Sequence, residues 1–139
     1  MADVLSLEIV TPERLLVRED VSAVQAPATT GYLGILPGHA ALLAELGIGY
    51  LNFEAGGKRW YLAVHGGYLE VLADRVRVLA TTAERAEEIN VERAKAAMKR
   101  AQDEMVNASL GVDPAAALNA MARAQARLDA AAGKQGAPA

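Results

Sequence analysis

Four arginines in the last third of the chain have the spacing of a binding site for an anion. Arg93 and Arg100 are seven residues apart, and Arg123 and Arg127 are four apart, so each pair shares a face if its segment is helical. Guanidinium groups that converge repel one another unless an anion lies among them. Each charge-assisted hydrogen bond to a phosphate contributes about 1.5–3 kcal/mol. A polyphosphate site and solvated helix faces both remain open from the spacing alone.

No other set of residues has the pattern of an active site. The serines lie outside any nucleophile motif, and His39 and His65 have no third metal ligand in a suitable pattern. The segment Gly31-Tyr32-Leu33-Gly34 lacks the lysine of a phosphate-binding loop. We therefore expect no catalytic residue, no metal site and no enzyme activity of the chain itself. His65 is interpreted as a structural or surface residue.

The arginines require helices to position them, and the sequence from about Ile89 onward has a helical period. Asn90 can cap a first helix, and Asp113-Pro114 is a strong start signal for a second, which Gly133 can end. On the second helix an apolar stripe is predicted at residues three and four apart: Leu118, Met121, Gln125 and Leu128. The two helices should form an antiparallel hairpin. Its large apolar residues are few, so weak docking and permanent docking both remain open.

The residues before about Thr82 have the pattern of short strands. Leu5, Leu7 and Ile9 alternate with polar residues, as in a half-buried strand. Ala55-Gly56-Gly57 and Ala73-Asp74-Arg75 each separate two strand-like segments, as hairpin loops do. Strands of about five residues, spaced about ten apart, predict an antiparallel β-sandwich or barrel. The expected fold is an N-terminal antiparallel β-sandwich, residues 1–84, followed by a C-terminal antiparallel two-helix hairpin, residues 85–139.

Composition and charge narrow the function classes. Residues 1–88 carry seven Lys/Arg and twelve Asp/Glu, whereas residues 89–139 carry seven and five. The two parts therefore have different charge and should have different partners, but the C-terminal excess of two is too small for general nucleic-acid binding. The chain has no cysteine, no apolar stretch long enough to cross a membrane and no leader pattern. We expect a soluble intracellular protein without disulfides.

The segment Gly31-Tyr32-Leu33-Gly34-Ile35-Leu36-Pro37-Gly38-His39-Ala40 combines turn glycines with apolar residues and is predicted to be a shaped contact loop. An ordinary connection between strands is the alternative. With Leu42-Leu43 after it, this segment resembles the signature loop of the ATP synthase epsilon subunit family. Gly66-Gly67-Tyr68-Leu69-Glu70-Val71 and the junction from Val78-Leu79-Ala80 to Ala83-Glu84 resemble that family too. The order of sandwich and helical hairpin agrees with it, so the resemblance runs nearly end to end.

This resemblance implies a non-catalytic rotor subunit in the central stalk of an F-type ATP synthase, peripheral to the cytoplasmic face of the bacterial plasma membrane. The sandwich would bind the gamma subunit and the ring of c subunits, with Tyr32 and His39 as candidate contacts. The hairpin would inhibit ATP hydrolysis by extending toward the beta subunit, with the alpha subunit as a further candidate partner. Arg123, Arg127 and Lys134 are the residues expected at that contact.

Some bacterial members of the family bind ATP between hairpin and sandwich, through a motif that here reads Ile89-Asn90-Val91-Glu92-Arg93-Ala94. Asn90 stands where the motif has Asp, which removes a negative charge. The resemblance thus implies no required cofactor, and ATP as a regulatory ligand. The implied ATP-binding residues are Glu84, Ile89, Asn90, Arg93, Ala94, Arg100, Arg123 and Arg127. A stand-alone nucleotide sensor, or a β-sandwich adaptor with a helical interaction hairpin, are the alternative functions.

Overall fold

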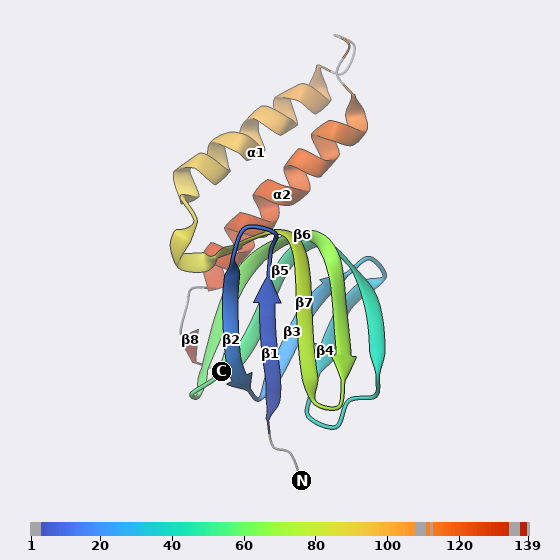
Figure 1. Ribbon diagram of the computed structural model, residues 1–139. Coiled ribbons are helices and arrows are strands. Elements are labelled where there is room, and N and C mark those ends of the chain that lie inside the picture. The colour runs from blue at the N-terminus through green and yellow to red at the C-terminus, as the bar shows by residue number, and fades with distance from the viewer. Residues whose placement is uncertain (1–3, 108–110, 112, 134–136, 139) are drawn as a thin grey trace.

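The computed structural model describes residues 4–107, 111, 113–133 and 137–138, and it has the two expected parts (Figure 1). A β-sheet domain comes first and a helical hairpin rises from one of its ends. The strands are β1 (Leu5–Val10), β2 (Leu15–Val21), β3 (Ala23–Ala28), β4 (Gly31–Ile35), β5 (Leu42–Ala55), β6 (Lys58–Leu72), β7 (Arg75–Arg85) and β8 (Ala137–Pro138). The turn η1 (Ala86–Glu88) leads into α1 (Val91–Val106), and α2 (Pro114–Gly133) follows. The division at residues 84 and 85 stays a prediction.

The strands form one continuous sheet in the order β2-β1-β7-β6-β5-β3-β4, with β8 added to β6. All pairs are antiparallel except β1 and β7, which pair in parallel. The long strands β5, β6 and β7 bend over one end of the domain and take part in both layers (Figure 1). The predicted β-sandwich is therefore confirmed, but it is one mixed sheet folded onto itself.

Strands of about five residues were the wrong expectation for β5, β6 and β7, which have 14, 15 and 11 residues. Gly66 and Gly67 lie inside β6. A Cβ on Gly67 would lie 2.0 Å from the carbonyl oxygen of Leu79, and its φ of 118° disfavours any other residue. Glycine lets the strand bend here without ending it.

The core lies between the two layers, as the alternation predicted: Leu5, Leu7 and Ile9 are fully buried. In β6 the residues of the main core are Leu62 and Val64 before the bend, then Leu69 and Val71 after it. The alternation thus shifts by one residue at Gly66-Gly67, which keeps apolar side chains inside both layers.

Both predicted helix starts are confirmed. The side-chain oxygen of Asn90 accepts a hydrogen bond from the backbone N–H of Arg93 at 3.1 Å, and a carboxylate oxygen of Asp113 accepts one from Ala115 at 3.0 Å. The side of α2 predicted from these residues is only partly covered: Met121 and Leu128 are half-buried, whereas Leu118 is 53% exposed and Gln125 is exposed. The buried residues of α2 are all small: Ala117, Ala124, Ala126 and Ala130. Small side chains allow the backbones of packed elements to approach closely. The buried face of α2 is therefore the face that carries these alanines.

The segment Gly31–Ala40 is not one loop. Its first half, Gly31–Ile35, is the edge strand β4, which pairs with β3. Only residues 36–41 connect β4 to β5, at the end of the sandwich opposite the hairpin (Figure 1). The backbone N–H of Gly38 donates to the carboxylate of Asp74 at 2.6 Å, which ties this loop to the β6–β7 turn.

Candidate functional site

The hairpin docks on the sandwich through α2. Ile48, Tyr50, Tyr61 and Ala63 alternate with core residues in β5 and β6 and point out of the sandwich, where Ala126, Ala130 and Ile89 pack against them. At the end of α2, Gly133 lies so close to the ring of Tyr61 that a Cβ there would be 2.7 Å away. The other helix, α1, packs mainly against α2. The docking contact is therefore small and consists of short side chains on an aromatic surface.

Beside this contact, a cleft of about 460 Å³ lies between the hairpin and the C-terminal end of β7. Six of the eight residues predicted to bind ATP line it, together with Glu88 and Ala97: Glu84, Asn90, Arg93, Ala94, Arg100 and Arg127. The structure brings these side chains together from β7, α1 and α2. The cleft matches the size and position of a small-ligand site between two structural parts.

The charges in the cleft are unequally paired. The Nε of Arg127 donates to a carboxylate oxygen of Glu84 at 2.6 Å, so this pair is satisfied. Within the described part of the chain, Arg93 and Arg100 have no ion-pair partner. Two unpaired guanidinium groups that face one small cleft favour an anionic ligand. Asn90 lines the cleft while its side-chain oxygen caps α1.

Two predicted residues are not among those that line the cleft. Ile89 packs with Ala63, Ala126 and Ala130 in the docking contact, so its role in the structure is to anchor the start of the hairpin. Arg123 is half-buried on α2 and lies near His65. Lys134 lies outside the described residues.

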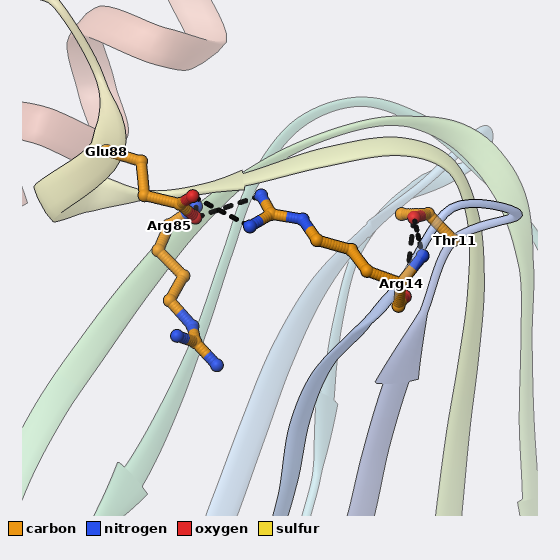
Figure 2. Close-up of polar contacts among 4 residues, drawn as sticks. All are labelled: Thr11, Arg14, Arg85 and Glu88. Carbon is orange, nitrogen blue, oxygen red and sulfur yellow. Dashed lines mark hydrogen bonds and ion pairs between the residues drawn. The ribbon is translucent and has the colours of Figure 1, made fainter.

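A second polar cluster at the base of the hairpin was not predicted (Figure 2). The guanidinium of Arg14 binds both carboxylate oxygens of Glu88, at 2.8 and 3.0 Å, and Glu88 also accepts the backbone N–H of Arg85 at 3.1 Å. The hydrogen bond from Arg14 is the main reason that the pKa of Glu88 is lowered. Arg14 belongs to the turn after β1, which Thr11 closes by accepting the backbone N–H of Arg14 at 3.3 Å. The partners are 74 residues apart, so no local pattern could have indicated the pair.

The structure does not bring Tyr32 and His39 together. Tyr32 lies in β4, where its ring is 4.9 Å from that of Tyr50 and its hydroxyl accepts the backbone N–H of Tyr50 at 3.3 Å. Tyr32 is therefore near the docked end of α2, and burial raises its pKa. His39 lies in the β4–β5 loop at the opposite end of the sandwich. Their roles as contacts stay predictions.

The layer away from α2 has an exposed apolar strip that we name the open face. Its side chains are Leu43, Tyr68 and Leu79, which are 70%, 54% and 47% exposed. Tyr68 pairs with Leu79 across β6 and β7, and all three line one shallow hollow with Glu70 and Arg77. A contiguous apolar strip with a polar rim is typical of a surface that binds another protein. In the described residues, no helix is long and apolar enough to cross a membrane.

Known proteins match the chain over nearly its whole length. Residues 4–86 match the family model of the ATP synthase delta/epsilon chain β-sandwich domain, and residues 87–132 match that of the ATP synthase delta/epsilon chain long α-helix domain. An ATP synthase epsilon chain of Solibacter usitatus is 62% identical over 128 residues, which are 92% of this chain and 96% of the relative. That of Desulforamulus reducens is 45% identical over 131 residues, 94% and 99% of the two chains.

A solved structure of the mitochondrial ATP synthase of Euglena gracilis contains a chain with the same fold, with a TM-score of 0.82 at 24% identity. The match covers 95% of this chain and 83% of that one. The family models and the two relatives confirm the expected resemblance, and with it the expectation of a non-catalytic subunit. Sandwich and hairpin both match, in the order in which they occur here: the chain belongs to the ATP synthase delta/epsilon chain family.

Proposed function

We propose that the chain is the epsilon subunit in the central stalk of a rotary F-type ATP synthase. In this role it joins the gamma subunit to the ring of c subunits, couples proton flow to ATP synthesis and inhibits ATP hydrolysis through its hairpin. The family assignment supports this function, and so does the division of surfaces in the molecule. The observation that carries it is that the sandwich has one layer in contact with the hairpin and an apolar strip on the other.

The open face is the proposed contact with the gamma subunit. Leu43, Tyr68 and Leu79 present large apolar side chains on the rigid strands β5, β6 and β7, and such side chains dominate the energy of protein interfaces. The loop that contains His39 lies at the far end of the sandwich from the hairpin and is the proposed contact with the c ring, on the cytoplasmic side of the membrane. Tyr32 is also proposed for this contact because of the family resemblance. Its ring packs against Tyr50, and this position does not support a contact with the c ring.

The cleft is the proposed site of a regulatory ATP. Arg93 and Arg100, which have no ion-pair partner among the described residues, come from α1, and Arg127 comes from α2. A polyphosphate that binds all three would hold the two helices together and close to β7. ATP binding would therefore favour the docked hairpin, because a ligand stabilises the state that binds it. Asn90 stays beside this site as a neutral cap of α1.

The inhibitory state is the released hairpin. Its docking contact has few large side chains, since Ala126 and Ala130 provide most of the α2 side of it. When the contact opens, Arg123 and Arg127 become free to meet acidic residues of the beta subunit, and Lys134 is the third residue proposed for that contact. The alpha subunit is a further candidate neighbour. In this proposal ATP and the beta subunit compete for Arg127.

Assembly tests this proposal directly. The full chain should form a stable complex with its cognate gamma subunit that survives size-exclusion chromatography. A chain that stays monomeric in that mixture contradicts the proposed function. Leu79→Glu, which introduces a charge on the open face, should prevent the complex without unfolding the sandwich, because Leu79 is 47% exposed.

A further inference from the structure

His65 lies beneath α2 on the outer face of the sandwich. It pairs with Ile48 in β5 and with Thr82 in β7, and its Nδ1 is 2.8 Å from the hydroxyl oxygen of Thr82. Its other ring nitrogen, Nε2, is buried and has no hydrogen-bond partner among the described residues. A protonated imidazole carries an N–H on both nitrogens, and a buried donor without an acceptor is costly. The docked hairpin therefore selects the neutral ring.

The charges that surround His65 act in the same direction. On α2, Arg127 and Arg123 both oppose a positive charge on the imidazole, whereas Glu84 on β7 favours one. The carboxylate of Glu84 already accepts a hydrogen bond from Arg127, and this pairing weakens its stabilisation of a positive charge on His65. Burial, reinforced by Arg127, lowers the pKa of His65 to about 4. Both arginines belong to α2, so they lie near His65 only while the hairpin is docked.

We propose that His65 makes docking of the hairpin sensitive to acid, so that protonation of its imidazole releases α2 from the sandwich. In the released state the ring faces water, the arginines have left, and its pKa returns to about 6.5. The docked state binds this proton more weakly, so docking has its full stability above about pH 6.5 and loses it as the pH falls toward 4. This effect needs no nucleotide. Under the proposed function, it would place the hairpin in its inhibitory state when the cytoplasm becomes acidic.

Energy transfer within the full chain measures the effect. The chain has no cysteine, so Asp20→Cys on β2 and Gln102→Cys on α1 introduce two unique attachment sites for a donor and an acceptor dye. Between about pH 7.5 and pH 5.5 the equilibrium constant for docking should fall about three- to tenfold, and the fall should reverse on neutralisation. Titration should stop at about pH 5, above the range in which carboxylates become protonated. Fluorescence of the single tryptophan, Trp60, which packs against the main core, reports that the sandwich stays folded.

The two histidines of the chain supply a matched control. His65→Phe keeps a ring of similar size and removes the titrating group, so docking should no longer depend on pH in this range. His39→Asn removes the other histidine, in the distant β4–β5 loop, and should leave the wild-type dependence unchanged. His65→Asn, which retains a donor and an acceptor for Thr82, replaces His65→Phe if the larger ring perturbs folding. The inference is wrong if the wild type shows no acid release, or if both His65 variants release the hairpin at the same pH as the wild type.

Discussion

The Nε of Arg127 lies 2.6 Å from a carboxylate oxygen of Glu84, and this ion pair joins α2 to the last strand of the sandwich. Both side chains are about one-third exposed, so water screens the pair and its contribution to docking is modest. The same two residues line the cleft. Arg127 therefore belongs both to the docking contact and to the proposed nucleotide site, and any anion that enters the cleft acts on the position of the hairpin.

Arg100 tests the nucleotide site. Arg100→Ala should weaken ATP binding about 10- to 100-fold, the loss expected for one charge-assisted contact to phosphate. Lys99→Ala is the matched control, since it removes an exposed charge from the neighbouring residue, which is not among those that line the cleft. Calorimetry with ATP measures both. No binding by the wild type at millimolar ATP, or equal losses in the two variants, contradicts the proposed cleft.

Gly133 tests the docking contact. Gly133→Ala places a methyl group 2.7 Å from the ring of Tyr61, so the end of α2 must shift away from the sheet. Such overpacking costs about 1–3 kcal/mol, which is enough to shift a weak docking equilibrium toward the released hairpin. Energy transfer between dyes on β2 and α1 should show this release, whereas Ala132→Ser on the exposed neighbour should stay docked. A fully docked Gly133→Ala variant would show that Tyr61 does not limit the approach of α2.

Arg14 tests the cluster at the base of the hairpin. Arg14→Ala should lower the free energy of unfolding by about 0.5–1 kcal/mol at neutral pH, because a half-exposed bidentate pair is partly screened. The pKa of Glu88 is lowered in the folded state, so its contribution is present above its ordinary pKa and disappears as the pH falls through the folded value. Urea unfolding at neutral pH and at about pH 3 measures this. The difference between wild type and variant should shrink as the pH falls; a difference that does not change with pH has another cause.

Leu79 and Leu118 test which surface meets the gamma subunit. Both are about half exposed, Leu79 on the open face and Leu118 on α2. Leu79→Glu should reduce affinity for gamma at least about tenfold, as expected when a charge replaces an apolar interface anchor. Leu118→Glu makes the same chemical change on the hairpin and should leave assembly intact. Pull-down with the cognate gamma subunit compares the two variants. Equal binding by both would exclude the open face as the contact with gamma.

The sequence was sufficient for those features that depend on neighbouring residues. The burial of Leu5, Leu7 and Ile9 and the caps Asn90 and Asp113 follow from local patterns, and the structure has them. The sequence also contains an indication of the bend in β6. The apolar alternation shifts by one residue at Gly66-Gly67, but the expectation of short strands did not take this shift into account. The family motif that begins at Gly66-Gly67 does not depend on the bend, so the family could be identified without it.

Features that depend on contacts between distant segments could not be predicted in this way. The ion pair of Arg14 with Glu88 joins residues from the two parts of the molecule, and each residue alone resembles an ordinary surface charge. The buried face of α2 depends on which neighbours it packs against, so the alanines are buried and Leu118 is not. The spacing indicated Arg93, Arg100 and Arg127, and the family resemblance added Glu84, Asn90 and Ala94. The structure adds that Arg93 and Arg100 are left without ion-pair partners in its described part.

The rate of ATP hydrolysis by the assembled synthase, with the full chain or with a chain that ends at Glu87, tests the central claim most directly. The main core consists of residues of the sandwich alone, so the shortened chain retains what it needs to fold and to assemble. Removing residues 88–139 should preserve assembly and raise ATP hydrolysis severalfold, because the inhibitory helices are gone. Unchanged hydrolysis by a fully assembled complex would contradict inhibition by the hairpin.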